Sequence, residues 1–168
     1  MDLFGLEYAR VASANAAFPA IVGENGEITH AQFWKLVRTF ASGFARDGVD
    51  ETSVVAITSE MLVTVLAAVI ATSLRGARLI TAESAIAKAG IDKPTHFYRT
   101  VEMTAGKKFK LFDEEWLKNT TPDDESQWLN PRARPQSDWL TLHTSGTTGR
   151  QKYFCLTQEM VLDRKSVV

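Results

Sequence analysis

Apolar residues recur at helical spacing between positions 33 and 44, while lysines and arginines occupy the other faces of the same stretch. The apolar stripe consists of Phe33, Val37, Phe40 and Phe44. Thr29 and Gln32 precede it at the spacing of a capping box, in which each side chain bonds the backbone amide of the other residue. Gly48 follows at a position suited to a left-handed helix end. The pattern predicts a helix from about residue 30 to Gly48 that buries its aromatic stripe in a core.

Two short extended stretches come directly before this helix. Residues 19–22 are apolar, and residues 27–29 resume an extended pattern after the turn residues 23–26. Gly23 and Gly26 bracket that turn. Two such stretches joined by a short glycine-containing turn predict a small β-hairpin.

A strand–helix–strand unit follows the predicted helix. Residues 54–58 are β-branched and apolar without alternation, which is typical of a strand covered on both faces. Residues 60–74 have the length and apolar character of a buried helix that ends at Gly76, and residues 77–80 indicate a second strand. Because a helical crossover connects parallel strands, we expect the two strands to pair in parallel.

Weaker signals continue this alternation. Residues 83–89 favour a helix that ends at Gly90, residues 95–99 favour a third strand, and residues 138–142 favour a further strand. Alternating strands and helices predict an α/β fold, with a layered parallel or mixed sheet and flanking helices. We interpret residues 1–168 as a single domain.

Residues 100–135 break the alternation, and we interpret them as a loop-rich connector within that domain. They contain three prolines, and residues 113–118 favour a short helix. The acidic residues 123–125 resemble a metal cluster in composition. Consecutive acidic residues on regular backbone cannot all face one ion, so we expect a solvated loop there.

Charge balance narrows the classes of partner. The chain has 168 residues, with 19 lysines and arginines against 20 aspartates and glutamates, and a net charge of −1. This balance lacks the basic footprint from which nucleic-acid binders draw their affinity. We expect the small cluster of Lys107, Lys108 and Lys110 to form a solvated turn.

The cysteine content and the apolar runs bear on cellular location. Cys155 is the single cysteine, and the three histidines are too far apart in sequence for a zinc-ligand spacing. The first ten residues include acidic residues where an export signal would be basic, and they lack a sustained apolar core. The most apolar run, residues 61–74, is shorter than the roughly 20 residues that cross a bilayer. We therefore expect a cytoplasmic protein without a membrane span.

A segment rich in hydroxyl groups and glycine follows the strand predicted at 138–142. Glycines permit a close approach of a ligand to the backbone, and hydroxyls, amides and a cation are the groups that hold phosphate oxygens. The spacing is that of neither a Walker loop nor a nucleophile elbow. A hydroxyl-rich turn between two strands is the alternative interpretation. The candidate phosphate-binding residues are Thr144, Ser145, Gly146, Thr147, Thr148, Gly149 and Lys152.

The string TSGTTGRQK resembles the phosphate loop of the adenylate-forming superfamily, which includes acyl-CoA synthetases, aryl-acid ligases and adenylation domains of peptide synthetases. Residues 19–22, 28–34, 48–49, 54–58 and 76–77 also resemble family segments and stand in the family's order. The likeness covers about residues 19–82 and 136–158. The chain departs from the family at Gln151 and Tyr153, where relatives usually carry proline and glycine.

The resemblance implies a function in ATP-dependent carboxylate activation. In relatives, this loop wraps the β- and γ-phosphates of ATP, with Mg²⁺ as the metal, while a carboxylate attacks the α-phosphate. The products are an acyl-adenylate and pyrophosphate. Thr144, Ser145, Thr147 and Thr148 would supply hydroxyls, and Lys152 would be the charge partner. An acid–thiol ligase of the acyl-CoA type would then use coenzyme A as acceptor.

The resemblance also implies that this chain is the N-terminal portion of the large domain of such an enzyme. The family's acyl pocket, adenine-binding segment and hinged C-terminal domain lie downstream of the phosphate loop. We therefore expect the chain to be inactive alone and to self-associate through an exposed apolar surface. The alternative is a non-enzymatic nucleotide-binding or assembly module derived from that family.

A direct consequence is that the isolated chain should not catalyse carboxylate-dependent exchange between ATP and pyrophosphate. The exchange is measured with radiolabelled pyrophosphate and a panel of carboxylic acids. Turnover above the no-carboxylate background would refute this expectation.

Overall fold

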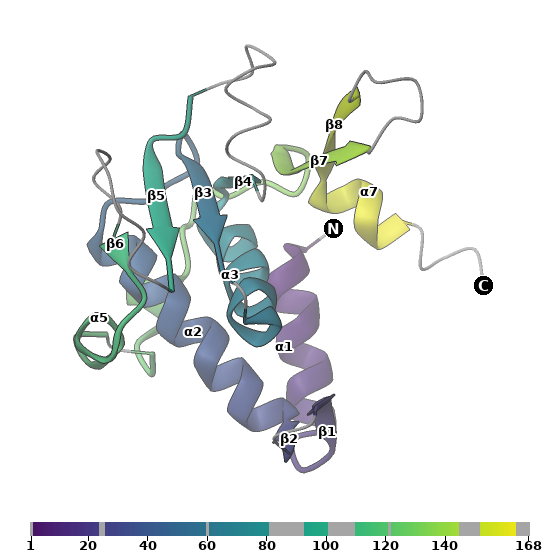
Figure 1. Cartoon of the computed structure of the whole chain (residues 1–168). Helices are drawn as coiled ribbons and strands as arrows, with labels where there is room; N and C mark the ends of the chain where they lie inside the picture. The colour runs from purple at the N-terminus through teal and green to yellow at the C-terminus, as the bar shows by residue number, and fades with distance from the viewer. Residues whose placement is uncertain are drawn as a thin grey trace.

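The computed structural model describes residues 2–23, 26–59, 61–80, 93–100, 110–120, 122–144 and 152–163. The described strands form a mixed six-stranded sheet in the order β6-β5-β3-β4-β7-β8, in which only β8 runs antiparallel to its neighbour (Figure 1). Their bounds are β3 (Val54–Thr58), β4 (Arg78–Ile80), β5 (His96–Arg99), β6 (Lys110–Leu111), β7 (Asp138–Thr144) and β8 (Lys152–Thr157). The predicted α/β class with a layered, mostly parallel sheet is confirmed.

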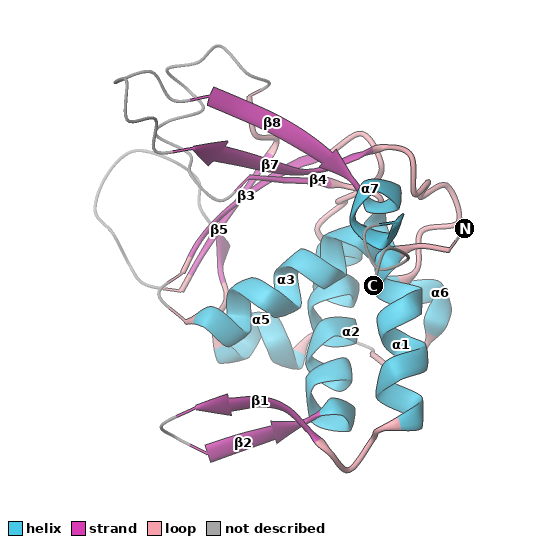
Figure 2. Ribbon diagram, turned by 90° about the vertical axis from the view of Figure 1, so that its right-hand side faces the viewer, coloured by secondary structure: helices cyan, strands magenta, loops and turns pink. Residues whose placement is uncertain are grey.

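Three long helices pack together on one side of this sheet (Figure 2). They are α1 (Phe4–Ala14), α2 (His30–Arg46) and α3 (Leu62–Arg75). The predicted hairpin is present as β1 (Pro19–Gly23) and β2 (Gly26–Thr29), which pair with each other outside the main sheet. Shorter helices are α5 (Glu114–Lys118), α6 (Glu125–Trp128) and α7 (Gln158–Asp163). No helix in the described part of the chain has the length and apolar character to traverse a bilayer.

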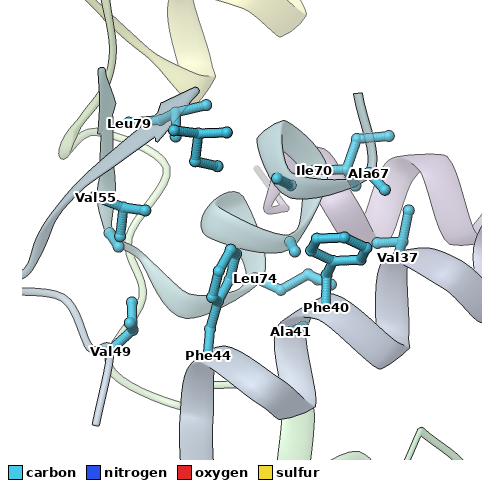
Figure 3. Packing of buried hydrophobic residues seen from close by; sticks show 14 of the residues in the cluster. Val37, Phe40, Ala41, Phe44, Val49, Val55, Ala67, Ile70, Leu74 and Leu79 are labelled. Atoms are coloured by element: carbon cyan, nitrogen blue, oxygen red, sulfur yellow. The ribbon is translucent and has the colours of Figure 1, made fainter. Parts of the chain in front are cut away.

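The core lies between α2, α3 and the central strands (Figure 3). The aromatic stripe of α2 is buried as predicted, and the capping box of Thr29 and Gln32 is formed. Gly48 has a φ of +83°, so the left-handed end predicted for this helix is also confirmed. Side chains from α2, α3 and the strands interdigitate in this layer: Val37, Phe40, Phe44, Ile70, Leu74, Val55 and Leu79.

The parallel pairing of the strand–helix–strand unit follows the prediction. Val54 to Ala56 register with Arg78 to Ile80, and α3 provides the crossover. Gly76 ends α3 with a φ of +72°, and a Cβ there would approach the Cα of Ala133 to 2.9 Å. The third strand is confirmed as β5, whereas the helix predicted at 83–89 lies outside the described residues.

Three elements were not predicted. Helix α1 has no side-chain cap of its own at Leu3, and its N-terminal amides are bonded by residues distant in sequence. Within the predicted connector, β6 and α6 form beside the short helix that the sequence indicated. Asp124 caps α6 by accepting from the Ser126 N–H, and Asp123 forms a 3.2 Å ion pair with Arg38.

A buried carboxylate joins α2 to the β5–β6 edge of the sheet. The side chain of Asp47 is 8% exposed, and it accepts hydrogen bonds from the Tyr98 hydroxyl at 2.8 Å and the Trp116 indole at 2.9 Å. Lys110 lies 2.7 Å from the same carboxylate. The expectation of a turn at Lys110 is therefore wrong, because this residue lies in β6; its side chain is 50% exposed, so it is solvated as expected while it pairs with Asp47. Lys107 and Lys108 lie outside the described residues.

The environment of Asp47 shifts the pKa of its carboxyl group. Burial by itself raises the pKa, but the hydrogen bonds from Lys110, Trp116 and Tyr98 outweigh it, so the pKa of Asp47 lies below its usual value. A carboxylate whose folded-state pKa is lowered stabilises the fold above its unfolded pKa. That stabilisation is lost as the pH falls through the folded pKa.

We expect Asp47→Asn to lower the free energy of unfolding at pH 7 by about 2 kcal/mol, because buried donors lose a charged acceptor. Below the unfolded pKa of about 4 the difference from wild type should shrink, since the unfolded carboxylate then takes up a proton, and it should vanish as the pH falls through the lower folded pKa. Urea unfolding at a series of pH values measures both effects. Asp123→Asn is the control, since its side chain is 84% exposed and its ion pair lies at the surface. Equal effects of the two substitutions at pH 7 would contradict the role given to Asp47.

Candidate functional site

The predicted phosphate-binding segment joins two paired strands. Thr144 ends β7, Lys152 begins β8, and the two residues face each other in the antiparallel register. The structure therefore brings the first and last predicted site residues together at one end of a hairpin. The remaining predicted residues, Ser145, Gly146, Thr147, Thr148 and Gly149, lie outside the described residues. A pair of strands at this point is compatible with both interpretations of the sequence.

The far end of β7 lies where parallel α/β sheets bind ligands. Strands β3 to β7 are parallel, so their carboxyl ends meet at one edge of the sheet. The chain leaves β4 for β5, on the far side of β3, whereas it leaves β7 for β8 in the opposite direction. The adjacent strands β4 and β7 thus flank a topological switch point. Ligands in open α/β sheets bind in the crevice at such points.

Trp139 anchors the base of the β7–β8 hairpin to α3. Its side chain is 2% exposed, and its indole Nε1 donates to the Val69 carbonyl and the Thr72 hydroxyl, each at 3.2 Å. The ring of Phe4 lies 5.0 Å away, between centroids. An indole buried on one face and hydrogen-bonded on its edge fixes both the position and the rotation of this part of β7.

Two polar contacts within the sheet accompany this anchor. Arg78 and Asp138 form a 2.7 Å ion pair at the amino ends of β4 and β7. Thr141 and Cys155 face each other across the hairpin, with 3.6 Å between Oγ1 and Sγ. Burial raises the pKa of the Cys155 thiol, so this cysteine is protonated at neutral pH and is a poor nucleophile.

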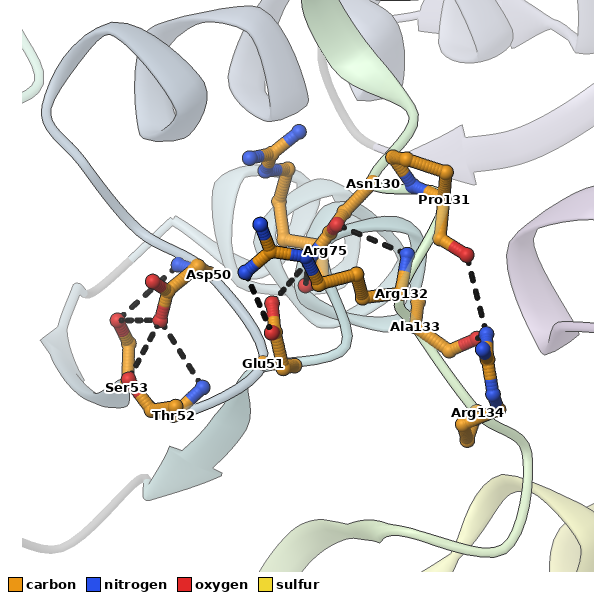
Figure 4. Close-up of polar contacts among 10 residues, drawn as sticks. All are labelled: Asp50, Glu51, Thr52, Ser53, Arg75, Asn130, Pro131, Arg132, Ala133 and Arg134. Carbon is orange, nitrogen blue, oxygen red and sulfur yellow. Dashed lines mark hydrogen bonds and ion pairs between the residues drawn. The ribbon is translucent and has the colours of Figure 1, made fainter.

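A turn at residues 130–133 leads the connector into β7 (Figure 4). The side-chain Nδ2 of Asn130 donates to the Glu51 carboxylate at 2.8 Å and to the Arg75 carbonyl at 2.9 Å. Arg132 donates to the other oxygen of Glu51 at 3.3 Å. The hydrogen bond from Asn130 lowers the pKa of Glu51. Sequence reasoning missed this turn, although the Asn-Pro dipeptide at 130–131 is a turn signal.

A depression lies at the opposite edge of the sheet, beside β6 and α5. It has a volume of about 420 Å³ and adjoins Asp47. Its two cations are engaged, since Lys110 pairs with Asp47 and Arg46 donates to the Trp116 and Asn119 carbonyls. Within the described ranges, no group of three histidine, cysteine or acidic residues could hold a metal ion. The β7–β8 end therefore remains the candidate site.

Comparison with known proteins agrees with this fold. The sequence model of the family described as AMP-binding enzyme matches residues 8–167. Among curated protein sequences, none matches the chain significantly.

Solved structures resemble the chain over nearly its whole length. The N-terminal subdomain of Klebsiella oxytoca NpsA in complex with 3-hydroxybenzoyl-AMSN has a TM-score of 0.72 at 16% identity, covering 94% of this chain and 41% of that one. The inhibitor-bound N-terminal domain of FACL13 from Mycobacterium tuberculosis has a TM-score of 0.72 at 16% identity, covering 95% of this chain and 45% of that one. VinN in complex with 3-methylaspartate has a TM-score of 0.74 at 15% identity, covering 98% of this chain and 50% of that one. The chain thus spans half or less of these proteins and shares their fold.

The anchor of the hairpin gives a testable prediction. Trp139→Phe keeps an aromatic ring beside Phe4 but removes the indole donor, and we expect a loss of about 1–2 kcal/mol in the free energy of unfolding. Local opening of the hairpin should also speed alkylation of Cys155, a partly buried residue of β8 that faces Thr141 of β7. The comparison is Trp34→Phe, which removes an indole N–H from α2. Equal alkylation rates in the two variants would rule out Trp139 as the anchor.

Proposed function

The chain belongs to the AMP-binding enzyme family, and from that premise we propose that its β7–β8 end holds the phosphates of ATP during carboxylate activation. The single observation that carries this proposal is the family match over residues 8–167, which includes the whole hydroxyl- and glycine-rich segment. Supporting it, Thr144 and Lys152 lie opposite each other beside a switch point of the parallel sheet. The resemblance stated from the motif and the family assignment agree.

The chemistry of the segment suits a polyphosphate. Thr144, Ser145, Thr147 and Thr148 offer hydroxyl donors, and Gly146 and Gly149 allow backbone amides to approach phosphate oxygens. Lys152 would place a positive charge beside them. Reactions at phosphorus are catalysed mainly by positioning and by stabilisation of charge, so a loop with these groups needs no nucleophile of its own. This agrees with a Cys155 that is protonated and half-buried.

The proposed reaction begins with a carboxylic acid and ATP. A carboxylate oxygen attacks the α-phosphorus, the bond to the bridging oxygen of the β-phosphate breaks, and the products are an acyl-adenylate and pyrophosphate. The loop would bind the β- and γ-phosphates, which leave as pyrophosphate, and would stabilise the charge that develops on them. Mg²⁺ would arrive with the nucleotide and bind mainly phosphate oxygens.

This chain matches only part of each compared structure. We assign the rest of the reaction to the part that it does not match. We propose that residues 1–168 form the first part of the ATP-binding domain of an acid–thiol ligase in the cytoplasm, with coenzyme A as the thiol. Alone, the chain would bind ATP without turnover and would self-associate through exposed apolar side chains. Candidates for such contacts are Phe154 and Met160 near the C-terminal end of the described chain, 43% and 52% exposed.

A second candidate function is a non-enzymatic nucleotide-binding or assembly module of the same family. The observation that favours it is the well-satisfied core, in which α2, α3 and the sheet bury their apolar faces within the described residues. Such a module would hold its fold without further chain. It differs from the first candidate in needing no carboxylate.

MgATP binding by the full chain tests the proposal. We expect heat of binding in isothermal titration with MgATP and with magnesium pyrophosphate, and little with AMP, because the loop would contact the β- and γ-phosphates. Lys152→Ala should raise the Kd for MgATP about tenfold, the effect of one lost charge-assisted contact. Lys35→Ala, an exposed lysine of α2, is the matched control and should leave the Kd unchanged.

Three results would decide against the proposal. Absence of any MgATP binding beyond the effect of equal ionic strength would contradict it. Equal losses of MgATP affinity in Lys152→Ala and Lys35→Ala would show that the interaction is non-specific charge attraction. A Kd for AMP equal to that for MgATP would place the contact away from the β- and γ-phosphates.

A further inference from the structure

A buried amide side chain links the β7–β8 hairpin to two helix ends. Gln158 begins α7 directly after β8, and its side chain is 1% exposed. Its Oε1 accepts from the backbone N–H of Phe4 at 2.7 Å, and its Nε2 donates to the carbonyl of Ser73 at 3.1 Å. The Phe4 amide lies in the first turn of α1, and the Ser73 carbonyl lies in the last turn of α3. The Phe4 amide is one of the N-terminal donors that a helix leaves unbonded, and the Ser73 carbonyl accepts from Gln158 in addition to the Gly76 N–H at the end of α3.

The start of α1 depends on residues from other elements. Leu3, its N-cap residue, makes no side-chain cap, and the amide of Gly5 donates to the Ser73 hydroxyl at 2.9 Å. A Cβ at Gly5 would approach the side chain of Leu74 to 2.6 Å, so α1 and α3 meet closely at this point. Gln158 therefore lies in a junction of α1, α3 and α7, and α7 lies beside the N-terminal end of α1 (Figure 2).

The length of the hairpin makes the position of its far end sensitive to the orientation of its base. The hairpin register runs from Asp138 and Thr157 at the base to Thr144 and Lys152 at the far end. At roughly 3.4 Å per residue, that distance is about 20 Å. The register with β4 covers Leu140 and Thr141, so the last part of β7 extends beyond it. A small rotation at the base is therefore amplified at the far end.

We propose that Gln158 is a positioning residue that sets the orientation of the β7–β8 hairpin and thereby of its far end at Thr144 and Lys152. Trp139 fixes the β7 side of the base, and Gln158 fixes the end of β8 by tying the next residue to Phe4 and Ser73. Trp139 holds only the β7 strand, through Val69 and Thr72, so the hydrogen bonds of Gln158 are what hold the β8 strand at the base of the hairpin. For nucleotide affinity, this inference rests on the proposed function.

The test uses the full chain and three variants. Gln158→Met keeps the length of the side chain and removes both hydrogen bonds. Ser73→Ala removes the hydroxyl that bonds Gly5 and leaves the carbonyl that bonds Gln158. Tyr98→Phe removes a buried hydrogen bond to Asp47 near the opposite edge of the sheet. Two quantities are measured in each protein: the Kd for MgATP and the hydrogen-exchange rates of backbone amides.

We expect Gln158→Met to raise the Kd for MgATP about tenfold and to speed amide exchange in β8 by a similar factor, with exchange in β3 and β5 unchanged. Ser73→Ala and Tyr98→Phe should leave the Kd within about twofold of wild type, although they also remove buried hydrogen bonds. A purely structural role would give all three variants the same small effect on the Kd. Should Gln158→Met not fold, Gln158→Asn, shorter by one methylene, takes its place.

The two proposals fail separately. If wild-type protein binds no MgATP, the proposed function is contradicted, and the exchange rates alone decide the role of Gln158. If Gln158→Met matches Tyr98→Phe in β8 exchange and in the Kd, Gln158 does not orient the hairpin. Binding by wild type together with slow β8 exchange in Gln158→Met would overturn the positioning role and leave the proposed function intact.

Discussion

Burial of the apolar faces of α2 and α3 against β3 and β4 is the interaction on which the rest of the molecule depends. Phe40, Phe44, Leu74 and Leu79 are almost fully inaccessible, and each such side chain contributes roughly 1.5–3 kcal/mol on transfer from water. This layer holds β3 and β4 in parallel, and the parallel register extends on one side to β7 and on the other to β5. The carboxyl ends of these strands consequently meet at one edge of the sheet.

The C-terminal end of α3 is the point to which the later part of the chain is attached. The last carbonyls of a helix lack partners within the helix. Here the Ser73 carbonyl accepts from Gln158, while the Leu74 and Arg75 carbonyls accept from the backbone and side chain of Asn130. The Val69 carbonyl, one turn earlier, accepts from Trp139. The connector, β7 and α7 are thus all bonded to one helix end, and this fixes the hairpin relative to the core.

Local patterns of the sequence were sufficient for the elements that carry their own signals. The Thr29–Gln32 capping box, Gly48 at positive φ and the unbroken apolar run at 54–58 each specify a boundary or a face within a few residues. Helix α1 was missed because its N-terminus is capped by Gln158 and Ser73, which no local pattern reveals. Lys110 was misplaced for the same reason, since its partner Asp47 is 63 residues away. The motif identified the family, whereas the contacts that hold the hairpin join residues far apart in the sequence.

The central claim is that the end of the β7–β8 hairpin holds a polyphosphate. Two-dimensional NMR of the ¹⁵N-labelled chain during titration with MgATP tests it directly. The account predicts shifts of the Thr144 and Lys152 amides and of their neighbours at the carboxyl edge of the sheet, with the amides around Asp47 and in the β1–β2 hairpin unchanged. Amide shifts confined to the depression beside Asp47, or no shifts at saturating MgATP, would contradict it.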